Sequence, residues 1–218
     1  MTRPSRNLIS RSTRFLIRKA LREDIGRGDL TTEVLIPSGL AGEAYIEAKS
    51  EGILCGTTVV QEVFRAVDKK LQIAAKISDG ARVTKGKQVI TVRGRTASIL
   101  KAERVALNFL GRLSGIATLT HKFVRRVKGT RARIFDTRKT TPLWRELEKY
   151  AVRSGGGQNH RFGLWDEILV KDNHWIAMRK LLEETRCRYF GKRLSPVKRK
   201  RIPVEVEVKN LAQLSHLL

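Results

Sequence analysis

Three positively charged residues follow two segments that the sequence predicts to be β-strands. Arg138 and Lys139 come just after a strand predicted over 131–135. Lys171 comes just after a second strand, predicted over 168–170. Ligands of α/β barrels and of open α/β sheets bind at the carboxyl ends of the strands. Because the arginine fork can hold both oxygens of a carboxylate or phosphate, this arrangement favours an anionic ligand.

A glycine run followed by a histidine and an arginine lies between these positions along the chain. The three glycines at 155–157 are expected to let the backbone come close to a ligand. His160 and Arg161 add two further hydrogen-bond donors. So many cationic groups on one rim repel one another, and a ligand with several negative charges would offset that repulsion. The alternative, a set of unrelated surface cations, explains each residue singly but not their joint position at strand ends and beside the glycines.

The elements that must position these residues alternate between strand and helix after residue 130. Thr141 followed by Pro142 predicts the start of a helix, and the glycines at 155–157 predict its end. Further along, the pattern predicts a helix over 176–184, a strand over 203–208 and a helix from Asn210. This alternation is typical of a parallel α/β layer or barrel.

The first 112 residues predict a different organisation, a small antiparallel sheet with helices. Predicted strands cover 42–49, 71–77 and 88–92, and predicted helices cover 57–67 and 97–110; a further helix, predicted over 114–127, follows this part. Ser12 is expected to cap an amphipathic first helix. Neither the glycines at 26 and 28 nor the stretch 80–87 has the spacing of a nucleotide-binding loop. No Ser/His/Asp or Cys/His arrangement indicates covalent catalysis either.

The composition is strongly basic. The 218 residues include 45 lysines and arginines against 21 acidic residues, for a net charge of +24. Such a charge implies an anionic partner, whether nucleic acid, a membrane surface or a small molecule. No apolar run reaches the about 18 residues of a membrane helix, and the cysteines and histidines show no zinc-ligand spacing. The basic run over 186–201 is predicted to be a solvated loop. We expect neither a membrane nor a specific nucleic acid as partner.

Residues 1–22 contain no acidic residue and several arginines. An organellar transit peptide has this composition, but an amphipathic first helix explains it equally directly. We favour the helix and expect a cytoplasmic protein. The two cysteines, Cys55 and Cys187, agree with a reducing compartment because they are too few for a disulfide scaffold.

Four segments resemble the quinolinate phosphoribosyltransferase family, also called carboxylating nicotinate-nucleotide pyrophosphorylase. They cover residues 135–142, 147–152, 155–161 and 170–174, while residues 24–32 and 103–110 resemble the N-terminal domain of the family. The resemblance implies α+β combined with α/β: a small N-terminal α+β sandwich domain over 1–112 and an incomplete α/β barrel over 113–218.

The resemblance also implies a reaction of NAD biosynthesis. Quinolinate and phosphoribosyl pyrophosphate give nicotinate mononucleotide, pyrophosphate and CO2, with Mg²⁺ as cofactor. Arg138, His160 and Arg161 would hold the carboxylates of quinolinate. Arg104 would reach the same substrate from the partner subunit of a homodimer.

Three further residues take catalytic roles in this resemblance. Lys139 and Lys171 would hold phosphoribosyl pyrophosphate. Glu207 would lie near the ribose and the metal and would stabilise positive charge on the sugar. No side chain of this chain is assigned as a direct metal ligand.

The length leaves the predicted barrel unfinished, because a closed eight-unit barrel needs roughly 250 residues by itself. The family continues beyond the position of Leu218, so we expect weak anion binding and little turnover from this chain. Three alternatives stay open: a nucleic-acid binder driven by charge, a related pyrophosphorylase acting on another carboxylated base, and an inactive fragment or relic of the family's enzyme.

Overall fold

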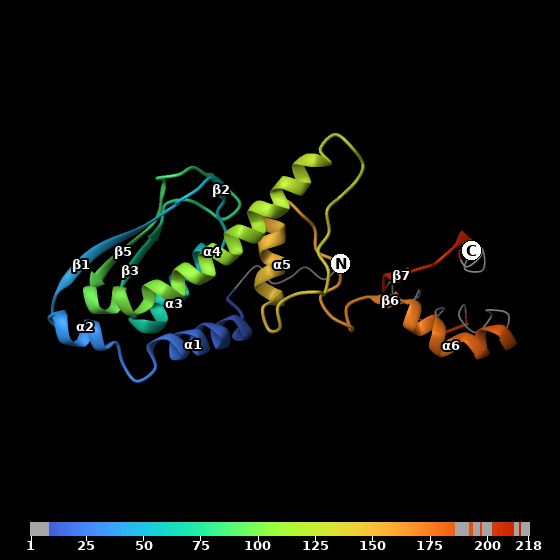
Figure 1. Ribbon diagram of the computed structural model, residues 1–218, viewed down its shortest axis with the longest axis horizontal. Helices are drawn as coiled ribbons and strands as arrows, with labels where there is room; N and C mark the ends of the chain where they lie inside the picture. The colour runs from blue at the N-terminus through green and yellow to red at the C-terminus, as the bar shows by residue number, and fades with distance from the viewer. Residues whose placement is uncertain (1–8, 186–191, 194–196, 198–201, 212–213, 215–218) are drawn as a thin grey trace. The chain divides into compact units, whose positions relative to one another are not determined.

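A computed structural model describes residues 9–185, 192–193, 197, 202–211 and 214 (Figure 1). The chain divides into two compact units, Arg3–His160 and Arg161–Leu218, and each is described by itself. None of the helices in this described part of the chain is long and apolar enough to cross a membrane. The predicted site residues fall in both units, with Arg104, Arg138, Lys139 and His160 in the first and Arg161, Lys171 and Glu207 in the second.

The first unit contains a three-stranded antiparallel sheet. β5 (Gln88–Arg95) lies between β1 (Ala41–Glu47) and β3 (Gln72–Ala75). The two-residue strands β2 (Gly52–Ile53) and β4 (Arg82–Val83) form a separate antiparallel ribbon, which no sequence pattern predicted. With the helices packed beside the sheet, the predicted α+β organisation of this part is confirmed (Figure 1).

Two helices pack against each other in this unit and contribute to its core. α3 (Thr57–Val67) has the predicted bounds. α4 (Thr96–Arg126) is one helix of 31 residues, so the predicted division into two helices was wrong. Its buried face continues past Gly111 to Leu113 and Ala117. A glycine inside a helix costs only about 1 kcal/mol, which the burial of the next apolar side chains outweighs.

The two N-terminal helices are both capped by side chains that the sequence patterns did not identify as caps. α1 (Arg11–Ile25) begins after Ser10, not Ser12, and the Ser10 hydroxyl accepts a hydrogen bond from the Thr13 amide at 3.1 Å. α2 (Leu30–Leu35) lies where a loop was expected, and Asp29 caps it by accepting from the Thr32 amide at 3.0 Å. Hydrogen bonds from Thr32 hold the pKa of Asp29 below its ordinary value.

α5 (Arg145–Ser154) ends before the glycines as predicted, but its predicted start was wrong. Leu143 has a φ of +67°, which interrupts the helix between Pro142 and Arg145. The hydroxyl of Tyr150 on α5 donates to the Asp79 carboxylate at 2.7 Å. Asp79 also accepts from the first amides of α3. Burial and the hydrogen bond to Asp79 raise the pKa of Tyr150.

The strand predicted over 131–135 is reduced to one parallel bridge between Phe135 and Gln158. The amide of Gln158 donates to the carbonyl of Ile134 at 2.8 Å, and the amide of Asp136 donates to the carbonyl of Gln158 at 3.1 Å. Residues 131–133 are exposed, so they lack the buried face that would extend the pairing.

The second unit contains a parallel pair of strands. β6 (Ile168–Val170) pairs with β7 (Val204–Val206), and α6 (Asp172–Thr185) follows β6. The parallel pairing confirms the predicted α/β organisation of this part, although β7 is shorter than predicted and α6 begins earlier. Most of the basic run 186–201 and of the helix predicted from Asn210 lies outside the described residues.

Candidate active site

Arg138 and Lys139 form a cationic segment in the first unit. Lys139 is exposed, and its amide donates to the Thr137 hydroxyl at 3.0 Å. The Nε atom of Arg138 is buried and has no hydrogen-bond partner among the described residues. Within the same part of the chain, no carboxylate forms an ion pair with either side chain. A buried donor without an acceptor is costly, so this segment has the properties of an anion-binding site.

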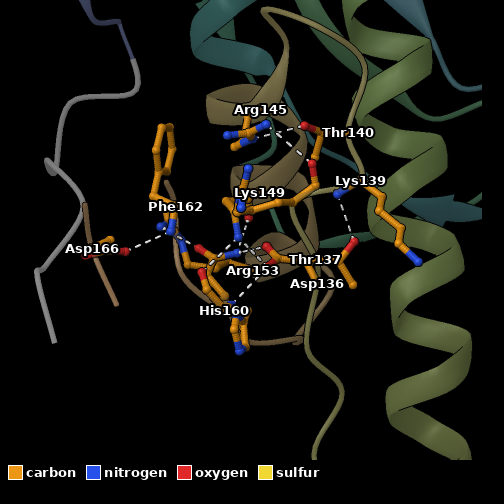
Figure 2. Close-up of polar contacts among 12 residues, drawn as sticks. Asp136, Thr137, Lys139, Thr140, Arg145, Lys149, Arg153, His160, Phe162 and Asp166 are labelled. Atoms are coloured by element: carbon orange, nitrogen blue, oxygen red, sulfur yellow. Dashed lines mark hydrogen bonds and ion pairs between the residues drawn. The ribbon is translucent and has the colours of Figure 1, made fainter. Parts of the chain in front are cut away.

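The carboxylate of Asp136 is the centre of a buried polar network next to this segment (Figure 2). It accepts hydrogen bonds from the ammonium of Lys149, the side-chain amide of Asn159 and the backbone amide of His160, the last at 2.9 Å. The side chains of Lys149 and Asp136 are only 3% and 7% exposed. Because a buried charge needs a partner of opposite sign, each of these two residues depends on the other.

His160 is held at both of its backbone polar groups. Its amide donates to Asp136, and its carbonyl accepts from the Lys149 ammonium at 2.8 Å. This network places His160 and the Arg138 segment side by side in the first unit, because Asp136 is two residues before Arg138. The sequence analysis predicted both residues as ligands of the same anion.

Lys171 and Glu207 lie together in the second unit. They follow the paired strands β6 and β7, and their side chains form an ion pair at 3.3 Å. The backbone of Glu207 is fixed on both sides, since its amide donates to the Val170 carbonyl and its carbonyl accepts from the Trp175 indole, each at 2.9 Å. Both side chains remain about half exposed.

The two remaining predicted residues, Arg161 and Arg104, belong to different units. Arg161 is 6% exposed and donates to the carbonyl of Glu167 at 3.1 Å within the second unit. Arg104 is exposed on α4 in the first unit. Neither position tests the predicted contact with a substrate, so the binding roles of Arg161 and Arg104 stay predictions.

The glycine run packs closely against helices of the first unit. A side chain on Gly155 would meet the carbonyl oxygen of Ala117 and the Thr120 side chain, both on α4. A side chain on Gly157 would meet the Thr120 and Val152 side chains at 2.8 and 2.7 Å. These two glycines therefore allow close packing of the helices. The sequence analysis predicted only that they let the backbone approach a ligand.

Arg112 on α4 ties the segment before α5 to both helices. Its guanidinium donates to the Thr141 hydroxyl and to the Glu148 carboxylate, and it lies 5.5 Å from the centre of the Trp144 ring. The ring of Trp144 stacks on Phe109 of α4. Burial acts to raise the pKa of Glu148, but hydrogen bonds from Arg112 and Thr141 outweigh it and lower the pKa.

Sequence analysis missed Asp136, Lys149 and Asn159, although all three lie in or beside the motifs. In the structure, Lys149 lies between Leu147 and Ala151, both of which are fully buried. Arg145, Lys149 and Arg153 also repeat every four residues, which places them on one helix face. Without the position of Asp136 in space, that repeat is indistinguishable from a solvated face.

An antiparallel sheet with helices, followed by a parallel pair of strands, is a combination of α+β and α/β organisation. Family models give this class a name. The quinolinate phosphoribosyl transferase N-terminal domain matches residues 29–114, and the C-terminal domain of the same family matches residues 116–218. The chain belongs to the quinolinate phosphoribosyltransferase family.

Individual relatives support this assignment. The nicotinate-nucleotide pyrophosphorylase [carboxylating] of Mycobacterium leprae is 40% identical over 212 residues, which cover 95% of this chain and 72% of the relative. A probable enzyme of the same name from Bacillus subtilis is 48% identical over 161 residues, 74% of this chain and 55% of the relative. The chain therefore spans about half the length of several curated relatives that it matches.

Solved structures show the same similarity. NadC from Streptococcus pyogenes has a TM-score of 0.82 at 39% identity, covering 95% of this chain and 72% of that chain. The nicotinate-nucleotide pyrophosphorylase of Francisella tularensis has a TM-score of 0.80 at 39% identity, covering 94% and 69%.

Proposed function

We propose that the chain transfers the phosphoribosyl group of phosphoribosyl pyrophosphate to quinolinate and releases pyrophosphate and CO2. The product is nicotinate mononucleotide, a precursor of NAD. Family membership supports the reaction type, and the names of the relatives match it. The observation on which the proposal rests is the Arg138 segment, where a buried guanidinium nitrogen has no acceptor within the described residues.

The quinolinate-binding residues are proposed from residue chemistry and the family resemblance. Arg138 and His160 lie in segments joined by the Asp136 network, and each carries nitrogen donors that suit a carboxylate. Arg161 is the third proposed ligand, and Arg104 is proposed to come from a partner subunit. Two adjacent carboxylates on one ring need several positive groups, because each unpaired charge at a partly buried site is costly.

Lys139, Lys171 and Glu207 are the proposed residues for phosphoribosyl pyrophosphate. The Lys139 side chain is free to reach a phosphate because it is exposed. The ion pair of Lys171 with Glu207 keeps both charges at the strand ends, where the substrate phosphates and ribose can exchange with them. Loss of pyrophosphate leaves positive charge on the anomeric carbon, which the Glu207 carboxylate stabilises.

We propose that Mg²⁺ binds together with phosphoribosyl pyrophosphate and lies near Glu207, because proteins usually hold Mg²⁺ through one or two carboxylates together with substrate phosphates. Glu207 offers a carboxylate that is about half exposed. When bound, Mg²⁺ would supply charge neutralisation for the pyrophosphate leaving group.

Bond formation requires positioning more than proton transfer. The pyridine nitrogen of quinolinate attacks the anomeric carbon as the bond to pyrophosphate breaks, and no proton moves in this step. The ring nitrogen is then cationic. Its positive charge stabilises the electron pair that stays on the adjacent ring carbon when the carboxylate departs as CO2, and a proton from solvent then binds to that carbon. His160 acts here as an orienting donor.

The direct test measures quinolinate binding by calorimetry and nicotinate mononucleotide formation by chromatography. We expect quinolinate to bind and Arg138→Ala to weaken binding by about 10- to 100-fold, the loss of a charge-assisted hydrogen bond. Nicotinate, which has one carboxylate fewer, should bind more weakly than quinolinate. A chain that binds neither quinolinate nor phosphoribosyl pyrophosphate would contradict the proposed function, as would equal binding by the Arg138→Ala variant.

We further propose a homodimer in which Arg104 completes the site of the partner subunit. The exposure of Arg104 on α4 supports this assignment. Arg104→Ala and Arg138→Ala should each lose quinolinate binding, while a refolded equal mixture should regain about a quarter of the sites through mixed dimers. No recovery in the mixture, with dimers present by light scattering, would contradict a shared site. A cytoplasmic location completes the proposal and agrees with a free, buried thiol at Cys55.

A further inference from the structure

Three cations on α5 repeat every four residues and lie along one face of the helix. We call Arg145, Lys149 and Arg153 the cation row. Their side chains contact the two segments that carry Arg138 and His160 (Figure 2). The proposed reaction assigns no role to any of the three.

The first member of the cation row holds the Arg138 segment. The guanidinium of Arg145 donates to the carbonyl of Arg138 at 3.3 Å and to the hydroxyl of Thr140 at 3.1 Å. These two contacts lie on either side of Lys139. They restrict the backbone from which both the Arg138 and Lys139 side chains project.

The second member joins the two segments. The Lys149 ammonium donates to the Asp136 carboxylate and to the carbonyl of His160. The residue is only 2% exposed. Its charge is therefore directed at protein oxygens and cannot reach a ligand in solvent.

The third member secures the residue before His160. The guanidinium of Arg153 donates to the side-chain oxygen of Asn159 at 2.9 Å. The amide nitrogen of Asn159 then donates to Asp136 and to the carbonyl of Lys149. Because Arg153 takes the oxygen, the amide nitrogen of Asn159 must face Asp136.

We propose that the cation row is a positioning device that fixes the backbone of Arg138 and His160 for a dicarboxylate ligand. The inference rests on the proposed function, since it assumes that these two residues bind quinolinate. Arg145, Lys149 and Arg153 are positioning residues that hold backbone carbonyl and side-chain oxygens, while Arg138 and His160 are the groups that contact the ligand. At metal sites, loss of the contacts that orient the ligands typically costs about 10- to 100-fold in affinity or activity, and we expect an effect of the same order here.

The experiment compares quinolinate and phosphoribosyl pyrophosphate affinities of the full chain by calorimetry. Lys149→Met should lower quinolinate affinity by about 10- to 100-fold and phosphoribosyl pyrophosphate affinity by less, because Lys149 binds the His160 carbonyl directly, while Arg145 still holds the backbone on both sides of Lys139. Arg145→Met should weaken both ligands, because Arg138 and Lys139 share the segment that Arg145 holds. Arg145→Lys, which keeps the charge and one donor, should recover part of each affinity.

Two controls separate positioning from general destabilisation. Lys49→Met makes the same chemical change at a side chain that is 84% exposed, and should leave both affinities unchanged. Val63→Ala removes buried volume in α3 and destabilises the fold away from the network. All measurements are made well below the melting temperature of each variant. If Val63→Ala lowers quinolinate affinity as much as Arg145→Met does, or if neither cation-row variant lowers it, the proposal is overturned.

A second readout does not depend on ligand binding. In ¹⁵N-histidine-labelled protein, the His160 amide should be protected from hydrogen exchange through its bond to Asp136. Lys149→Met and Asp136→Asn should lower that protection by more than they lower the protection of the His121 amide inside α4, which reports the change in global stability. If wild type fails to bind quinolinate, the proposed function fails, but this exchange experiment still decides whether the cation row fixes His160. Unchanged protection in both variants would refute the positioning role.

Discussion

Replacing Lys149 with methionine is expected to lower the free energy of unfolding by about 3–5 kcal/mol, the cost of leaving a buried charge without its partner. Methionine has a similar length and no charge, so the Asp136 carboxylate would keep only its neutral donors, Asn159 and the His160 amide. The change is measured as the shift of the urea midpoint, followed by circular dichroism.

A double-mutant cycle tests the cause of this destabilisation. Asp136→Asn combined with Lys149→Met should be less destabilised than the sum of the single variants, with a coupling energy of about 1–3 kcal/mol. Lys101→Met breaks the ion pair with Glu33, a partner that is half exposed, and should cost less than about 1 kcal/mol. Additive effects of the two buried substitutions would show that the charges are not coupled.

Replacing Gly155 with alanine is the second change with a large expected effect. The new methyl group would overlap the carbonyl oxygen of Ala117 and approach the Thr120 side chain at 2.8 Å. Since this oxygen is a backbone atom of α4, a change of side-chain rotamer cannot relieve the overlap. We expect the free energy of unfolding to fall by about 3 kcal/mol, at the upper end of overpacking costs.

A glycine on the same long helix provides the matched control. Gly111 lies within α4, and a side chain there would meet nothing within 4 Å. Gly111→Ala should therefore raise stability by about 0.5–1 kcal/mol through its higher helix propensity. If thermal denaturation showed the same small change for Gly155→Ala, the close packing of α5 on α4 would be disproved.

Local patterns in the sequence were sufficient to predict several helices and strands. The bounds of α3 follow from apolar residues at helical spacing, and β6 follows from three consecutive apolar residues before Lys171. The break predicted near Gly111 in α4 was wrong. The prediction took the glycine as a helix breaker, but the burial of Leu113 stabilises the helix beyond it. The start predicted at Thr141 was wrong because Arg112 and Glu148 hold that residue outside the helix.

The candidate site shows the same division between local and spatial information. Arg138, Lys139 and Lys171 were identified because they follow predicted strands, a relation that needs only short-range pattern. Asp136 and Lys149 were missed because their significance lies in a contact across 13 residues of chain. A lysine on a helix is normally solvated, and nothing local marks it as buried.

The sequence by itself determined the family, the order of most elements and the charged residues that suit anionic substrates, since motifs and periodicity are properties of neighbouring residues. The tertiary structure alone decided which polar residues are buried, which glycines allow helices to touch and which cations hold protein oxygens. Those outcomes depend on desolvation and packing between distant segments, and neither is encoded in any single window of the chain.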